Sequence, residues 1–173
     1  MEEWVSNMMP NKRAQLGTDM IVIVITIFVI ALVGLFMWWW FSSFNRSIQS
    51  SEGFTPESKV VLQGQADAYP GLIDGFVIFI FAGLWVALIM SSFMVDTHPA
   101  FLIIMVILLV FVMFGSAVLA NYFLEQASSE GLSTASADLP MTMWLFDHFV
   151  LVLVFMGASS SLVLFGKSFG SGI

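Results

Sequence analysis

The sequence predicts an all-α membrane protein that crosses the bilayer four times, with both ends on the same side. Of its 173 residues, 59% are hydrophobic and only 10% are charged, whereas an ordinary soluble domain carries about 25% charged residues. Four apolar stretches alternate with polar segments, and each has the roughly 20 residues that a helix needs to cross a hydrocarbon core about 30 Å thick. The bilayer is therefore the solvent that this composition fits.

The first predicted helix covers residues 19–41. It follows a polar or interfacial segment, residues 1–18, in which Pro10 interrupts any continuous helix. Three consecutive tryptophans, Trp38, Trp39 and Trp40, lie close to its end, and aromatic side chains of this kind anchor helices at the membrane–water interface. Residues 42–71 are predicted to be a polar loop.

The second and third helices are predicted over residues 72–95 and 99–123, joined by a very tight turn. This turn contains Asp96, His98 and Pro99, and proline is favoured in the first turn of a helix. We interpret the polar residues ahead of Pro99 as a cap for the third helix. A metal site is the alternative, and it would need further ligands. The short turn makes these two helices an antiparallel hairpin.

The remaining elements are an acidic loop over 124–140, a fourth transmembrane helix over 141–166 and a tail over 167–173. The loop carries three acids and no cation. Cations near the span ends favour the cytoplasmic side, and three lie on the side of the chain ends while two lie on the other: Lys12, Arg13 and Lys167 against Arg46 and Lys59. This slight excess favours both ends inside.

Small residues recur four apart within the later spans, as they do where membrane helices pack closely. The pairs are Gly83 with Ala87, Ser116 (beside Gly115) with Ala120, and Gly157 with Ser161. Together they predict a compact bundle or a lateral assembly.

Asp74, Asp147 and His148 are ionisable residues placed at or inside the second and fourth predicted spans. Such groups are costly in a membrane and are often functional, so a proton relay, a metal site or a shared cation site for Asp74 and Asp147 are all candidate roles. The alternative, which we prefer, is that they are separate interfacial residues and that the fourth span begins near Phe149.

No complete catalytic motif is present, and the chain has no cysteine, which rules out thiolate metal sites within it. We therefore expect no enzyme activity, no cofactor and no metal. The net charge is −7, which argues against a nucleic acid as partner because phosphate binding needs clustered cations.

The hairpin Asp96-Thr97-His98-Pro99-Ala100-Phe101, followed by an aliphatic helix ending in Ala120-Asn121-Tyr122-Phe123, resembles small membrane proteins of tailless, membrane-containing icosahedral bacteriophages and prophages. Leu139-Pro140 and the short Gly/Lys tail fit the same layout, so the resemblance covers roughly residues 72–170. It implies a virion membrane protein that packs in many copies and links the bilayer to capsid or vertex proteins.

Three functions are therefore considered. The first is a structural protein of a virion membrane whose partners are lipids and other membrane or capsid proteins. The second is a non-catalytic accessory subunit of a large cellular membrane enzyme complex, in which case the location is a bacterial inner membrane. The third is a small transport, pore or holin-like protein.

Overall fold

The computed structural model describes residues 12–94 and 99–170, with side chains described over 19–93 and 103–166. Within these residues every regular element is a helix, and four helices are long and apolar enough to cross a membrane. The prediction of an all-α, four-span protein is confirmed. The predicted turn with Asp96 and His98, and the side chain of Pro99, lie outside the described residues.

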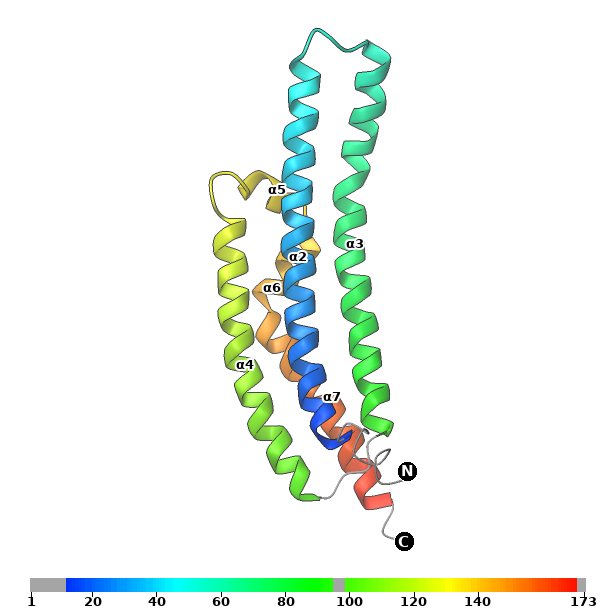
Figure 1. Ribbon diagram of the computed structural model, residues 1–173, viewed down its shortest axis with the longest axis vertical. Coiled ribbons are helices and arrows are strands. Elements are labelled where there is room, and N and C mark those ends of the chain that lie inside the picture. Colours follow the sequence, from blue (N-terminus) through cyan, green and yellow to red (C-terminus); the bar gives the residue numbers. More distant parts are fainter. Residues whose placement is uncertain (1–11, 95–98, 171–173) are drawn as a thin grey trace, which may run out of the picture. The chain divides into compact units, whose positions relative to one another are not determined.

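The first two long helices are α2 (Lys12–Ser50) and α3 (Pro56–Met94), of 39 residues each. Figure 1 shows them as the two arms of a hairpin that meet at the Ser51–Thr55 turn. The prediction of a polar loop over 42–71 is thus wrong, because all but five of these residues are helical.

The start of α3 explains why the helix begins so early. Thr55 Oγ1 accepts a hydrogen bond from the backbone N–H of Ser58 at 3.3 Å, Pro56 occupies the first position, and Glu57 lies in the first turn. A capping hydroxyl, an early proline and an early acid are the usual features of a helix start. The helix then continues through Pro70, which is a helix-interior proline of the kind that membrane helices tolerate.

The second half of the chain contains α4 (Pro99–Ala127), α5 (Ser133–Ala137), α6 (Pro140–Asp147) and α7 (Phe149–Gly170). The predicted acidic loop thus holds a short helix, and the predicted single helix over 141–166 is wrong. The stretch is divided at His148, the residue that ends α6, which has a φ of −106° and a ψ of 14°. The part of this stretch that is long and apolar enough to cross a membrane is Phe149–Gly166.

The helices contribute to two compact units. One contains residues 27–81 and 119–148, with a core that includes Phe123 stacked on Phe146 at a centroid distance of 3.9 Å. The other contains the described parts of residues 1–26, 82–118 and 149–173. We call them the hairpin unit and the second unit.

The second unit is packed mainly through aliphatic and methionine side chains. Polar contacts between its described helices include those of Trp85 Nε1, which donates to Ser159 Oγ at 3.1 Å, and Ser91 Oγ, which donates to Asp19 Oδ2 at 3.4 Å. The ring of Trp85 also meets Phe155 edge-on. Its buried apolar residues include Met20, Leu88, Met105, Val112, Leu153, Met156 and Leu164.

Candidate functional site

The first turn of α6 is capped by a residue of another helix. Leu139 occupies the N-cap position and makes no side-chain cap, and Pro140 follows it. The backbone N–H groups of this turn that have no partner within α6 instead donate to Asp74 of α3. Its two carboxylate oxygens accept the backbone N–H of Met141 at 2.8 Å and that of Thr142 at 2.6 Å, and the Thr142 hydroxyl at 2.6 Å. A carboxylate is stabilised in this position by the partial positive charge of a helix N-terminus.

Asp74 is only 5% exposed, so its charge is held almost entirely by these three donors. Asp147, at the other end of α6, has a side chain that is 68% exposed. The two carboxylates therefore occupy different surroundings, and the structure gives them no common hydrogen-bond partner. A transport role for Asp74 would require these three hydrogen bonds to break.

Asp147 and His148 lie together at the break between α6 and α7. The Nδ1 atom of His148 is 3.0 Å from the carbonyl oxygen of Trp144 and 3.6 Å from Asp147 Oδ2, and the imidazole stacks on the Trp144 ring at 4.8 Å. Both neighbouring oxygens are acceptors, so Nδ1 carries the hydrogen in the neutral ring. Among the described residues, no group of three or more His, Asp or Glu could hold a metal ion.

The three predicted interface tryptophans have different surroundings. Trp40 is 65% exposed and Trp39 is 39% exposed, as expected at an interface, whereas Trp38 is buried at 5%. The Nε1–H of Trp38 donates to Asp138 Oδ2 at 3.0 Å, and its ring stacks on Tyr69 of α3. Trp38 thus joins α2, α3 and the segment between α5 and α6 within the hairpin unit.

Between Trp38 and the Ser51–Thr55 turn, polar groups connect the two arms of the hairpin. The Asn45 amide donates to Gln63 Oε1 at 3.2 Å. Nearer the turn, Gln49 Nε2 donates to the carbonyl oxygen of Lys59 at 2.9 Å, and Lys59 Nζ donates to the carbonyl oxygen of Gln49 at 3.0 Å. These reciprocal bonds hold the arms together where apolar packing alone would not.

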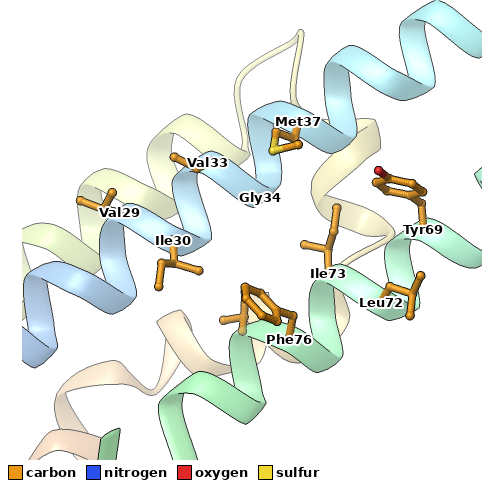
Figure 2. Close-up of a pocket in the computed structure, with 10 residues that line it drawn as sticks. Val29, Ile30, Val33, Gly34, Met37, Tyr69, Leu72, Ile73 and Phe76 are labelled. Atoms are coloured by element: carbon orange, nitrogen blue, oxygen red, sulfur yellow. The ribbon is translucent and has the colours of Figure 1, made fainter. Parts of the chain in front are cut away.

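Two cavities flank the contact between the arms of the hairpin. The first has a volume of about 580 Å³ and an almost wholly apolar lining, with Gly34 of α2 facing Ile73 of α3 (Figure 2). A Cβ atom on Gly34 would lie 3.0 Å from Ile73 Cγ2, so glycine permits this close approach. The second cavity, of about 490 Å³, has a polar lining that includes Arg46, Asp67 and Asp138.

The predicted small-residue pairs divide between buried and exposed positions. Gly157 is buried against Leu109, and Ser116 is buried with its hydroxyl on the carbonyl oxygen of Met113 at 2.8 Å. Of the other members, Ala120 is buried, Ser161 is half-buried, and Gly83, Ala87 and Gly115 are exposed. The sequence pattern alone does not distinguish a pair that packs inside the chain from one on an outer face.

Sequence reasoning missed the donors that surround Asp74 and the polar cavity beside Arg46. Leu139-Pro140 was a usable signal, because a helix that starts with proline behind a leucine has no cap of its own. The identity of the external cap had no local signal, since Asp74 lies 68 residues before Thr142.

The fold defines a four-span α-helical integral membrane protein. No protein-family model, curated protein or solved structure matches this chain. Its function is therefore inferred from the residues described above.

Proposed function

We propose that this chain is a structural membrane protein of a virion inner membrane, which packs laterally and links the bilayer to capsid or vertex proteins. The hairpin of α2 and α3 is the part that would reach the partner. The proposal is supported by the resemblance noted for residues 72–170 and by one structural observation, an exposed apolar surface near the end of this hairpin.

The height of the hairpin above the membrane follows from its sequence. The apolar stretch of α3, in which Asp74 is the single charged residue, begins at Leu72, and the helix starts at Pro56. These 16 residues extend about 24 Å along the helix axis at 1.5 Å per residue. The headgroup layer on each side of the hydrocarbon core is only about 5–7 Å thick, so the Ser51–Thr55 turn lies in water well beyond it.

The end of the hairpin carries apolar side chains that the described residues leave exposed. Val60 is 71% exposed, Val61 is 63% exposed, and Phe54 is 46% exposed. In the membrane such exposure is ordinary, but at this height these side chains face water, where adjacent exposed apolar groups indicate a protein contact. We call Phe54, Val60 and Val61 the tip surface.

The charge around the tip surface suggests the chemistry of the partner. Glu52 and Glu57 flank it, and Lys59 is the one cation between residues 47 and 70. Because Lys59 bonds to the carbonyl oxygen of Gln49, the accessible charge is mainly negative. A partner with an apolar patch bordered by basic side chains would be complementary, as one face of a capsid or vertex protein can be.

The second candidate function, an accessory subunit of a cellular membrane enzyme complex, is favoured by a different observation. The apolar cavity between α2 and α3 is lined in part by exposed side chains, among them Val33 and Phe76. Gly83 and Ala87 are also exposed on α3, and small residues allow another membrane helix to approach closely.

The absence of cysteine allows a direct test of the two candidates, because any introduced cysteine is the only thiol of the chain. Val60→Cys, labelled with a thiol-reactive photo-cross-linker on virus particles, is expected to cross-link to a capsid or vertex protein. Val29→Cys is the matched control, since Val29 borders the apolar cavity and is 48% exposed, and it should label lipid or another membrane helix.

The outcomes distinguish the candidates. If the chain is a virion protein, purified virus particles that retain their lipid should contain it in many copies together with capsid protein. Cross-linking from residue 60 to a cofactor-bearing membrane enzyme would favour the accessory subunit instead. Finding the chain in membranes of cells that carry neither virus nor prophage would rule out the virion assignment.

A further inference from the structure

The polar cavity of the hairpin unit lies between α2 and α3, nearer to the Ser51–Thr55 turn than the apolar cavity. Its volume is about 490 Å³, which is within the range of about 300–1,000 Å³ that is usual for small-molecule sites. The side chains that line it include Trp38, Asn45, Arg46, Asp67 and Asp138. One cation and two carboxylates therefore border the same space.

The depth of this cavity coincides with the lipid headgroups. The apolar run of α2 ends at Phe41, and Arg46 lies five residues, or about 7 Å, beyond it. On α3, Asp67 lies the same distance before Leu72, where the apolar run of that helix begins. Since the headgroup layer is about 5–7 Å thick, Arg46 and Asp67 lie at its outer edge, and the lining residue Trp38 lies on the membrane side of them.

The charged groups keep bonding capacity for a ligand. Among the residues that the structure describes, Arg46 has no hydrogen bond or ion pair. Asp138 accepts from Trp38 through Oδ2, and Asp67 accepts from Gln63 Nε2 through Oδ1 at 2.8 Å. Each carboxylate thus has a second oxygen that none of the described hydrogen bonds uses.

We propose that this cavity binds the headgroup of an ethanolamine phospholipid. The guanidinium of Arg46 would bind the phosphate, for which its planar set of donors is well suited. The carboxylates of Asp67 and Asp138 would accept hydrogen bonds from the primary ammonium. This site does not depend on the proposed structural role, and either could fail without the other.

The chemistry of the cavity selects among common lipids. A choline headgroup carries the same charges, but its quaternary ammonium has no N–H to donate to the carboxylates. A glycerol headgroup has no cation, so its net negative charge would meet two carboxylates and one guanidinium. The depth of the cavity favours a membrane lipid over a soluble phosphate ester.

Native mass spectrometry of the full-length protein tests this assignment. The protein is released from detergent micelles containing equal amounts of ethanolamine, choline and glycerol phospholipids with the same acyl chains. We expect one ethanolamine lipid to be retained about tenfold more than either competitor, as one charge-assisted hydrogen bond can provide. Arg46→Gln and Asp138→Asn should each remove most of this preference, and Arg46→Lys should keep part of it.

The variants are chosen to leave the fold intact. Asn at position 138 keeps an oxygen that can accept from Trp38, so D138N without lipid should lose less stability than Trp38→Phe, which removes the donor. Glu52→Gln removes one acid from the same hairpin without lining the cavity, so it should leave the preference unchanged. Equal retention of the three lipids, or a preference that survives both R46Q and D138N, would overturn the assignment. Equally strong binding of soluble phosphoethanolamine would overturn the choice of a lipid.

Discussion

Asp74 of α3 caps α6, with its Oδ1 atom 2.6 Å from the backbone nitrogen of Thr142. The cap replaces the side-chain cap that Leu139 cannot supply. It places a buried carboxylate against the positive end of a short helix. A buried carboxylate without donors and a helix start without acceptors would each be costly, and here each provides the partner of the other. Within the hairpin unit, this contact joins α3 to the first turn of α6.

Removing the carboxylate should destabilise the protein strongly. Asp74→Ala leaves two backbone N–H groups and a hydroxyl without their acceptor in a buried position, which we expect to cost about 3 kcal/mol of unfolding free energy. Asp74→Asn keeps one acceptor and should cost less. Reversible unfolding in mixed micelles provides the measurement. Asp147→Asn is the control, because that exposed carboxylate should change stability by less than about 0.5 kcal/mol.

Coupling between Asp74 and Thr142 can be measured by a double-mutant cycle. Thr142→Val removes the hydroxyl that donates to Asp74 Oδ1 at 2.6 Å and keeps the shape of the side chain. We expect a cost of about 1–2 kcal/mol alone, and a smaller cost when Asp74 is already Asn. Thr142→Ser should retain most of the stability. Strictly additive effects of the two substitutions would mean that this hydrogen bond does not contribute.

The contact between α4 and α7 in the second unit depends on a glycine. A Cβ atom on Gly157 would collide with the end of the Leu109 side chain, and Gly157 is buried. We expect Gly157→Ala to lower the unfolding free energy by about 1–3 kcal/mol through overpacking. Combining it with Leu109→Ala should cost less than the sum of the two single changes, since each makes room for the other.

Gly83 provides the matched control for this prediction. It also lies in a membrane helix, but it is exposed and its Cβ position has no atom within 4 Å. Gly83→Ala should therefore be neutral, or stabilising by up to about 1 kcal/mol because alanine favours the helix. A loss of stability in the purified monomer would contradict the described position of Gly83.

Trp38 should contribute more to stability than its neighbours in the tryptophan cluster. Trp38→Phe keeps an aromatic ring beside Tyr69 but removes the N–H that donates to Asp138 at 3.0 Å. We expect a loss of about 1–2 kcal/mol, typical of a hydrogen bond to a charged group. Trp40→Phe, at a position that is 65% exposed, should have little effect in the same unfolding measurement.

The start of α3 should depend on Thr55. Thr55→Ala removes the oxygen that accepts the backbone N–H of Ser58, and loss of such a cap costs about 1 kcal/mol. Because the first turn of α3 is exposed, the effect should be local. Faster amide hydrogen exchange at residues 57–59 is the expected signature, and Thr55→Ser should restore protection. Unchanged exchange in T55A would show that the cap is not needed.

The helical structure of residues 42–71 shows where sequence reasoning fell short. Their serines, glutamines and acids were interpreted as a loop because polarity marks the end of a membrane span. Polar residues also form helices in water, however, and Asn45 with Gln63, and Gln49 with Lys59, stabilise this pair of arms. The Thr55-Pro56-Glu57 start was visible in the sequence and would have shortened the predicted loop.

The sequence by itself determined that the chain has four helices able to span a membrane. Hydrophobicity over about 20 residues is a local property, and it decides directly whether a segment is stable in the bilayer. Tertiary structure alone decided that Asp74 caps α6, that Trp38 is buried while Trp40 is exposed, and that Gly157 packs inside while Gly83 faces outward. Each of these depends on which side chain from a distant segment arrives at the site, and hydrogen bonds and close packing are short-ranged.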